Sequence, residues 1–292
     1  MNLELRVMNY RLWLSSLLAL LFTVQASEAG TRQKQLLVLH TNDTHSCIQP
    51  LSENLADTAL ANRGGYLRRL AAIESERRQD PDLLLFDSGD FSQGSAYYTF
   101  FKGDVEVGLM NLMRYDAATI GNHEFDFGLD NMARIFRQAQ FPIVCANYDF
   151  TGTVVEGLVK PYVILKRKGL RIGVFGLAPE MEGLVSASNC AGVRYLDPVK
   201  TALETATLLK QQKQCDLVIC ISHLGWNMGN LVDDGKLIRG SRNIDLVLGG
   251  HSHTYFEQLR YENDLDGRPV PDDQNGKHAI YVGRIQLTLD KK

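Results

Sequence analysis

Residues 117–126 read Ala-Ala-Thr-Ile-Gly-Asn-His-Glu-Phe-Asp, a short apolar run followed directly by amide, imidazole and carboxylate side chains. Comparable runs recur along the chain, and most are unbroken by polar residues, which is typical of strands covered on both faces. We therefore expect a series of buried strands at residues 36–39, 83–86, 117–120, 142–146, 171–177, 216–222, 244–248 and 279–289.

The segments between these runs indicate helices. Apolar residues recur at helical spacing in 66–78, 129–139 and 198–213, and Pro198 stands at a favourable helix start. Alternating strands and helices predict an α/β architecture. The last run, 279–289, alternates apolar and polar residues and favours an antiparallel strand at a sheet edge. Residues 257–277 are polar with Gly and Pro, so we expect a surface loop or hairpin there.

The N-terminus has the order of a signal peptide. Arg6 and Arg11 precede an apolar run at 12–24, and the small residues Ala26, Ser27 and Ala29 follow it. The run has about 13 residues, fewer than the roughly 20 that span a bilayer. We expect residues 1–29 to be cleaved, leaving a periplasmic or secreted domain of residues 30–292 without stable membrane insertion. An uncleaved anchor is the alternative.

Composition narrows the range of functions. The chain has 292 residues, 22% of them charged, and a formal net charge of −3. Nothing in this balance favours a nucleic acid polymer or an anionic membrane as a partner. An enzyme for anionic substrates would then need a local positive centre, which bound metal could supply. The five cysteines include no Cys-x-x-Cys pair, so Cys-rich zinc sites and thioredoxin-like chemistry are not indicated.

Polar side chains follow five of the apolar runs, at the predicted carboxyl ends of strands. Ligand sites in open α/β sheets form at that edge. Carboxylate, imidazole and amide oxygen are ligands for divalent ions of intermediate hardness. Of the seven histidines, only His40 and His278 lie outside these groups. The candidates are Asp43, His45, Asp90, Asn122, His123, Asp126, His223, His251 and His253.

Each motif alone allows a simpler reading. Gly89-Asp90 is most often a turn, Asn122 is a common type of helix cap, and His223 could be a core histidine with its hydrogen bonds made. Their joint occurrence, each after a predicted strand, favours a shared metal site.

These motifs closely resemble those of the calcineurin-like metallophosphoesterases, and within them the 5′-nucleotidase group. The resemblance runs from about residue 35 to residue 290 and implies a four-layer α/β/β/α sandwich of the metallo-dependent phosphatase type, with the site at the sheet edge. It rests on Leu-His-Thr-Asn-Asp-Thr-His at 39–45, Asp-Ser-Gly-Asp-Phe-Ser-Gln-Gly at 87–94, Tyr-Asp-Ala-Ala-Thr-Ile-Gly-Asn-His-Glu-Phe-Asp-Phe-Gly at 115–128, Ser-His-Leu-Gly at 222–225 and Gly-Gly-His-Ser-His-Thr at 249–254.

The resemblance also implies two adjacent divalent metal ions. One would be held by Asp43, His45 and His253. The other would be held by Asn122, His223 and His251. Asp90 would bridge the two ions, because one carboxylate has two oxygens to share. Zn, Mn, Fe and Co all suit this mixed nitrogen and oxygen set.

Two further residues are implied in catalysis by attack of a metal-activated hydroxide on phosphorus. His123 would stabilise charge on the phosphoryl group or protonate the departing alkoxide. Asp126 would orient His123 and raise its pKa. The alternative for Asp126 is a carboxylate at a helix start. Glu124 is expected to make supporting contacts.

The implied activity is that of a 5′-nucleotidase-type phosphomonoesterase. Alternatives within the family are a cyclic-nucleotide phosphodiesterase and a UDP-sugar hydrolase. Full-length 5′-nucleotidases carry a second, nucleoside-binding domain, and this sequence ends at Lys292, where that domain would start. A catalytic subunit that needs a separate nucleoside-binding chain is therefore a further alternative. Trp226 and Tyr97–Tyr98 are candidates for stacking on a base, although packing is the more common use of such residues.

Overall fold

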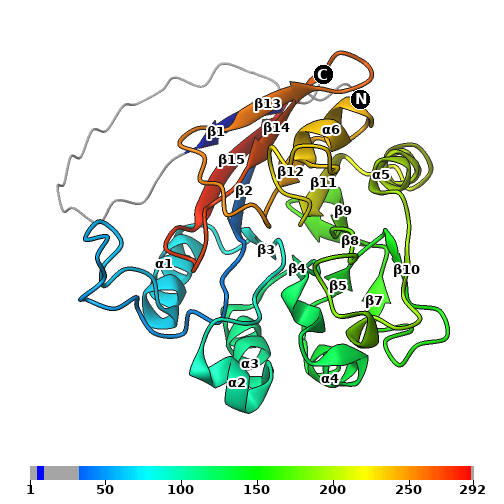
Figure 1. The fold of residues 1–292 in the computed structure, drawn as a ribbon. Coiled ribbons are helices and arrows are strands. Elements are labelled where there is room, and N and C mark those ends of the chain that lie inside the picture. The colour runs from blue at the N-terminus through cyan, green and yellow to red at the C-terminus, as the bar shows by residue number, and fades with distance from the viewer. Residues whose placement is uncertain (1–4, 10–32, 291–292) are drawn as a thin grey trace, which may run out of the picture.

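The structure is a computed structural model that describes residues 5–9 and 33–290. Two β-sheets pack face to face, and helices cover the outer face of each (Figure 1). The first sheet has the order β1-β15-β2-β3-β4-β5-β7. Its strands are β1 (Leu5–Asn9), β15 (Gly283–Leu289), β2 (Lys34–Thr41), β3 (Leu84–Asp87), β4 (Ala117–Ala118), β5 (Ile143–Val144) and β7 (Val159–Lys160).

The second sheet has the order β13-β14-β12-β11-β9-β8. Its strands are β13 (Arg260–Asn263), β14 (Pro269–Asp273), β12 (Leu246–Leu248), β11 (Leu217–Ser222), β9 (Leu170–Leu177) and β8 (Tyr162–Arg167). The central strands of both sheets run parallel, from β2 to β7 in the first and from β9 to β14 in the second. A separate two-stranded ribbon pairs β6 (Tyr148–Asp149) with β10 (Arg194–Tyr195).

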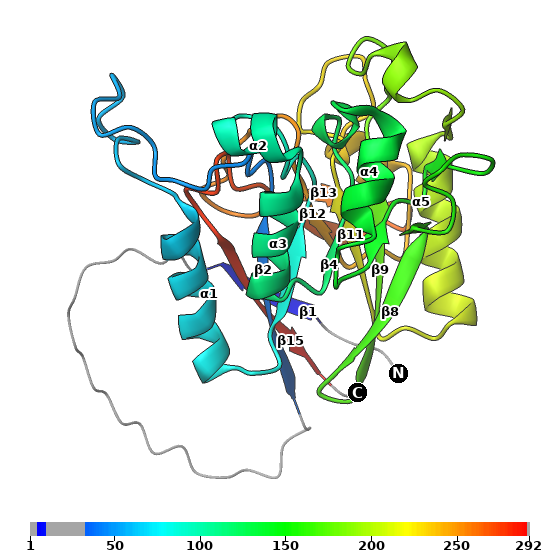
Figure 2. The same cartoon turned by 90° about the horizontal axis from the view of Figure 1, so that it is seen from below.

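Successive side chains of the buried strands point to opposite faces of their sheet, and this alternation builds the layers. In β2, Leu36 and Val38 face the second sheet, whereas Leu37 and Leu39 pack under the helices of the first. Figure 2 shows α1 and α5 on opposite sides of the sheets. The predicted four-layer α/β/β/α sandwich is therefore confirmed. The helices are α1 (Tyr66–Gln79), α2 (Ala96–Phe101), α3 (Asp104–Met113), α4 (Gly128–Phe136), α5 (Pro198–Thr207) and α6 (Asp234–Arg239).

Most predicted elements are confirmed, with shorter strands at 117–120 and 142–146, where only two residues pair in each. The helix predicted over 198–213 is α5, continued by a wider turn at Leu208–Gln212. β15 is antiparallel as predicted, but it is not an edge strand because β1 pairs with its outer side. Residues 257–277 form a hairpin of β13 and β14, and β14 is largely buried within the second sheet.

The predicted signal peptide falls mainly outside the described residues, and this includes its apolar run at 12–24. Within it, Leu5–Asn9 is described as strand β1. Among residues 5–9 and 33–290, no helix has both the length and the apolar character needed to cross a membrane.

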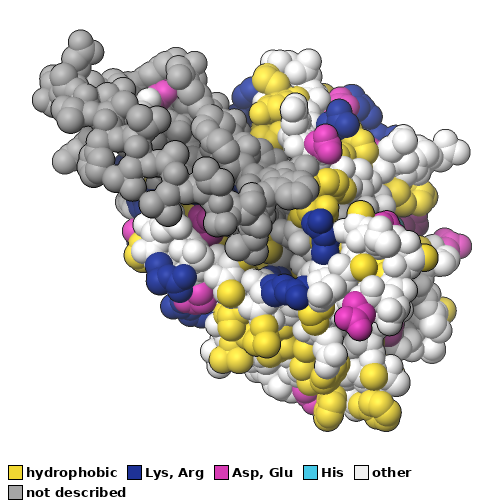
Figure 3. All heavy atoms as spheres, turned by 90° about the vertical axis from the view of Figure 1, so that its left-hand side faces the viewer, with side chains coloured by type: hydrophobic (Ala, Val, Ile, Leu, Met, Phe, Trp, Pro, Cys, Tyr) yellow, Lys and Arg dark blue, Asp and Glu magenta, His cyan; other side chains and the backbone are white. Residues whose placement is uncertain are grey.

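Several large apolar side chains on the helices α1, α2 and α3 are exposed, namely Leu67, Phe100, Phe101 and Leu112. Figure 3 views the molecule from the side of α1 and shows hydrophobic side chains gathered on the lower part of that face. This surface is made by helices of the outer layer and is distinct from the sheet edge that carries the polar motifs.

Gly176 in β9 lies where the two sheets approach each other closely, so a substitution there tests their packing. A Cβ at this position would overlap the Val144 carbonyl oxygen and Thr119 Oγ1. We expect Gly176→Ala to lower the free energy of unfolding by about 3 kcal/mol, measured by chemical denaturation. Gly108 in α3 is the matched control, because a Cβ there meets nothing within 4 Å. Gly108→Ala should be neutral or stabilising by about 0.5–1 kcal/mol, and equal effects at both positions would contradict this packing.

Candidate active site

The polar motifs meet where the parallel strands of both sheets end. The loop after β2 carries Asp43 and His45, and the loop after β3 carries Asp90. These strands pair in parallel, with Thr41 opposite Asp87, so their following loops start side by side. Asn122 follows β4, His223 follows β11, and His251 and His253 follow β12. The structure thus brings all seven predicted ligands to one edge of the sandwich.

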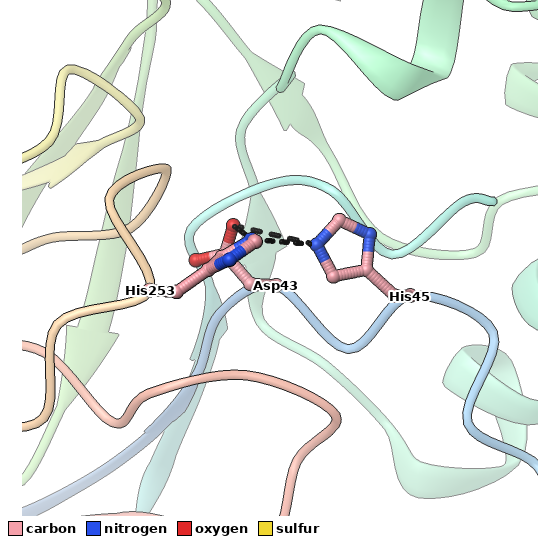
Figure 4. A group of neighbouring side chains, drawn as sticks. All are labelled: Asp43, His45 and His253. Carbon is pink, nitrogen blue, oxygen red and sulfur yellow. Dashed lines mark hydrogen bonds and ion pairs between the residues drawn. The ribbon is translucent and has the colours of Figure 1, made fainter. Parts of the chain in front are cut away.

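The first group consists of Asp43, His45 and His253, whose potential ligand atoms all lie within 4.8 Å of one another. Nε2 of His45 is 2.9 Å from Nε2 of His253. Oδ1 of Asp43 is 3.5 Å from His253 Nε2 and 3.8 Å from His45 Nε2. Figure 4 shows the three side chains converging from two different loops. At these distances the three side chains could coordinate a single ion.

The second group consists of Asp90, His223 and His251. Nε2 of His223 lies 3.1 Å from Oδ2 of Asp90, and the rings of His223 and His251 are 5.1 Å apart. Asp90 also forms a group with His45 and His123. Asp90 therefore lies between the two groups, which is the position predicted for a bridging carboxylate.

Three buried polar atoms of the candidate ligands lack hydrogen-bond partners among the described residues: His45 Nδ1, Asn122 Oδ1 and His223 Nε2. Such atoms are costly to bury unless something satisfies them. Nδ1 of His223 lies 2.6 Å from the Ser88 carbonyl oxygen, to which it can donate, and this leaves Nε2 facing Asp90. A divalent ion would satisfy Asn122 Oδ1 and His223 Nε2, so the residues present fit such an ion.

The protonation states also suit metal ligation. Burial lowers the pKa of His45 to about 3, and lowers that of His251 and of His253 to about 4. These imidazoles are therefore neutral at pH 7, the form that binds metal. Burial raises the pKa of Asp43 to about 7. A nearby cation would favour its charged form.

Asp90 and His223 are a buried pair of opposite charge. Burial alone would raise the pKa of Asp90, but the neighbouring His223 outweighs it and the net shift is downward. Burial would likewise lower the pKa of His223, whereas Asp90 and Asp43 raise it to about 10. Asp90 and Asp43 thus favour a positive charge beside them, which is the electrostatic environment of a cation site.

Backbone conformation turns these side chains toward one another. Positive φ angles occur at Asp43 (49°), His45 (44°), Asp90 (54°), His251 (71°) and His253 (55°). Left-handed backbone is uncommon for residues with a side chain and is found where function requires it. The tight turns bring residues two positions apart onto one side of each loop.

Glu124 has a supporting role that the sequence indicated only in outline. Its fully buried carboxylate accepts hydrogen bonds from the backbone N–H groups of Gly121 (2.6 Å), Asp90 (3.1 Å) and Ser92 (3.1 Å). A Cβ on Gly121 would overlap Asp90 Oδ1. The loop that carries Asp90 is thus fixed both by Glu124 and by close backbone packing.

His123 lies beside this centre and pairs with Asp126. Its Nδ1 is 3.1 Å from both carboxylate oxygens of Asp126, and its backbone N–H donates to Asp90 Oδ1 at 2.9 Å. Burial would lower the pKa of His123, but the bond to Asp126 and the charge of Asp90 give a net increase. The side chain is 31% exposed, so a substrate can reach it. His123 is thus a partly accessible imidazole whose ring lies 5.5 Å from that of His45 in the first group.

The three candidate stacking residues are engaged in packing or hydrogen bonds. Tyr98 is buried, and its hydroxyl donates to the His123 carbonyl oxygen at 3.1 Å. Trp226 packs edge-to-face on Phe256 with a centroid distance of 5.3 Å. The Tyr97 hydroxyl accepts a hydrogen bond from Gln49 at 3.1 Å. Packing therefore accounts for Tyr98 and Trp226, whereas Tyr97 makes an exposed hydrogen bond.

His278 is a neighbour of the site that sequence reasoning missed. Its ring centroid is 5.9 Å from that of His45, and its backbone N–H donates to the Asp43 carbonyl oxygen at 2.7 Å. It stands far from any apolar run that ends in a motif, so strand-end position gave no signal. The one feature that distinguished His278 in the sequence is that it is one of two histidines outside the motifs.

The chain is similar in sequence to known phosphoesterases. Residues 36–255 match the model of the calcineurin-like phosphoesterase family. Human 5′-nucleotidase is 30% identical over 277 residues, which cover 88% of this chain and 47% of the human protein. The trifunctional nucleotide phosphoesterase protein YfkN of Bacillus subtilis is also 30% identical, with 88% of this chain and 18% of that protein covered.

Solved structures agree with these sequence relatives. The 5′-nucleotidase precursor from Thermus thermophilus superposes with a TM-score of 0.78 at 28% identity, covering 87% of this chain and 51% of that one. The calcineurin-like phosphoesterase YfkN structure from Bacillus subtilis gives a TM-score of 0.72 at 27% identity, with 89% and 86% covered. The chain spans about half the length of the 5′-nucleotidases it matches. It belongs to the calcineurin-like phosphoesterase family, whose members are metal-dependent hydrolases.

Proposed function

We propose that this chain is an exported, dinuclear phosphomonoesterase of the 5′-nucleotidase type. The observation that carries the proposal is the convergence of two ligand groups, Asp43/His45/His253 and Asp90/His223/His251, with Asp90 between them. Asn122, whose Oδ1 is buried without a hydrogen-bond partner among the described residues, would join the second group. Two divalent ions held there would clamp the phosphoryl group and activate water.

The chain's own residues then have distinct tasks. The imidazoles and the carboxylates of Asp43 and Asp90 would hold the cations, and Glu124 fixes the loop of Asp90. His123, whose ring lies 5.5 Å from that of His45, would donate a proton or a hydrogen bond to the oxygen that leaves phosphorus. Asp126 keeps the His123 ring oriented through Nδ1, so that Nε2 is available to the substrate.

Two further parts of the proposal rest on other support. The nucleotide substrate is supported by relatives named 5′-nucleotidase and trifunctional nucleotide phosphoesterase. Export to the periplasm or the medium, by cleavage of residues 1–29, is supported by the signal-like order of Arg6, Arg11 and the apolar run after them.

The activity test is a substrate panel on the isolated chain loaded with Zn, Mn, Fe or Co. We expect release of phosphate from 5′-AMP and from an aryl phosphate, and complete loss in excess chelator that the metal restores. Preference for a cyclic nucleotide or a UDP-sugar would favour the family alternatives. Activity detected only after a nucleoside-binding chain is added would favour the subunit alternative. Turnover unaffected by a chelator would contradict the proposal.

A further inference from the structure

A buried side-chain network joins two of the loops that carry candidate metal ligands. Its centre is Asp234, which lies in the first turn of α6 on the outer face of the second sheet and has no exposed surface (Figure 1). One loop follows β11 at residues 223–226, and the other follows β12 at residues 249–254. Together the two loops carry three of the candidate ligands, namely His223, His251 and His253.

The first arm of the network reaches the loop after β11. Ser222 Oγ donates to Asp234 Oδ1, and the backbone N–H of Leu224 donates to Ser222 Oγ at 3.3 Å. The backbone N–H of Asp234 also donates to the Gly225 carbonyl oxygen at 2.9 Å. The residues on both sides of His223 are therefore attached to Asp234, either directly or through Ser222.

The second arm reaches the loop after β12. Gln274 Nε2 donates to Asp234 Oδ2 at 3.1 Å, and Ser252 Oγ donates to Gln274 Oε1 at 2.9 Å. Ser252 stands between His251 and His253 in the chain. The bridge from Asp234 through Gln274 therefore ends at the residue that these two histidines flank.

The carboxyl group of Asp234 also packs directly on the backbone of the second loop. A Cβ on Gly249 would lie 2.4 Å from Asp234 Oδ2 and 2.6 Å from Gln274 Nε2. The Gly249 N–H donates to the Asp273 carbonyl oxygen at 2.8 Å. Because this contact leaves no free space, a shift of the carboxyl group would be transmitted to the start of the loop.

The bonds of the network are shielded from solvent. Ser222, Asp234 and Gln274 have no exposed surface. Buried hydrogen bonds are strengthened by the low local dielectric, and breaking one leaves its partner unsatisfied. Groups that hold metal ligands in orientation typically contribute about 10–100-fold to metal affinity. A network that fixes two ligand loops at once is therefore expected to affect metal binding.

We propose that Asp234 is a positioning residue that fixes the loop after β11 against the loop after β12, and so holds their three histidines in a fixed arrangement. This inference rests on the proposed function, in which these histidines hold divalent ions. With the network intact, the loops are arranged before an ion binds, so binding does not have to order them. Asp234 acts on the ions only through the two loops.

The test measures the dissociation constant of Mn²⁺ by calorimetric titration of the metal-free protein. Gln274→Met removes the bridge and keeps every charge. Asp234→Asn turns one of the two acceptor oxygens into a donor, so one link is lost. We expect each change to weaken Mn²⁺ binding about 10–100-fold. Gln274→Met is the milder change and carries the test if Asp234→Asn does not fold.

The double variant Asp234→Asn/Gln274→Glu exchanges donor and acceptor across the bridge. The amide at position 234 can donate to the carboxylate at position 274, which still accepts a hydrogen bond from Ser252. The total charge equals that of the wild type. Mn²⁺ affinity should therefore return most of the way to the wild-type value, which a general loss of packing would not predict.

Asp272→Asn is the matched control for these variants. Asp272 is a fully buried carboxyl group of β14 whose two oxygens have no hydrogen-bond partner among the described residues. Burial and the neighbouring Asp234 raise the pKa of Asp272 well above its usual range, so at pH 7 this group is already neutral. Asp272→Asn should therefore keep the wild-type affinity for Mn²⁺.

Unchanged Mn²⁺ affinity in Gln274→Met, an equal loss in Asp272→Asn, or a double variant as weak as Asp234→Asn would overturn the positioning role. Failure of the proposed function looks different, since the wild type would then bind no Mn²⁺. In that case hydrogen–deuterium exchange of the metal-free protein decides the question. Faster exchange of residues 223–226 and 249–254 together in Gln274→Met supports the positioning role, and wild-type exchange in both loops overturns it.

Discussion

Replacing Asp90 by Asn should lower kcat for 5′-AMP and for an aryl phosphate by about 10³-fold or more. Asp90 lies between the two ligand groups, with Oδ2 3.1 Å from His223 Nε2 and Oδ1 accepting the His123 N–H. Asn has the same shape and tolerates the left-handed φ of 54° at this position. The change therefore removes the shared negative charge while leaving the loop in place.

Asp266→Asn is the matched control for this change. Asp266 is exposed in the β13–β14 turn and pairs with Arg242, away from the strand ends that carry the site. The activity of Asp266→Asn should equal that of the wild type. Without metal, Asp90→Asn should be less stable than the wild type in thermal unfolding at pH 7, because the charged partner of buried His223 is lost. Retained turnover in a folded Asp90→Asn protein would contradict the assigned role.

His123→Ala should lower kcat for 5′-AMP by about 10²–10⁴-fold, the usual contribution of a positioned proton donor. The side chain is partly exposed and its loss leaves the backbone bond to Asp90 intact, so the fold should be retained. If His123 protonates the leaving oxygen, the loss should be much smaller for p-nitrophenyl phosphate, whose leaving group needs no proton. A similar loss on both substrates would instead indicate that His123 stabilises charge on the phosphoryl group.

Asp126→Asn should shift the alkaline limb of the pH profile of kcat to lower pH. The pKa of His123 is raised overall, and its bond to Asp126 is the largest cause that raises it. A donor with a raised pKa stays protonated to higher pH, and activity falls as the pH rises through that pKa. Removing the carboxylate lowers the pKa, so the fall should come earlier. An unchanged alkaline limb would show that Asp126 does not act through His123.

The sequence alone was sufficient to predict the layers of the fold and the convergence of the site residues at one sheet edge. Unbroken apolar runs such as 171–177 and 216–222 predict strands buried on both faces, and parallel strands bring their carboxyl ends to one edge. Asp43, Asp90 and His223 could therefore be placed together without coordinates. Their positive φ angles and the spacing of the two groups could not be predicted, because these depend on turns set by tertiary packing.

The remaining misses have physical reasons. The helices α2 and α3 expose apolar residues such as Phe100 and Leu112, which blurs the periodicity that signals an amphipathic helix. β14 reads as polar because it contains Asp272 and Asp273, yet both are buried between neighbouring strands. His278 belongs to no strand end. Its backbone N–H donates to the Asp43 carbonyl oxygen, a long-range contact that no local pattern encodes.

The central claim is that the two ligand groups joined by Asp90 hold two divalent ions. The most direct measurement is the metal stoichiometry of the protein by native mass spectrometry after incubation with Mn or Zn and removal of free ion. The wild type should retain two ions per chain, and Asp90→Asn should retain fewer. A wild-type chain that binds no ion, or whose bound ions are unaffected by Asp90→Asn, would contradict the account.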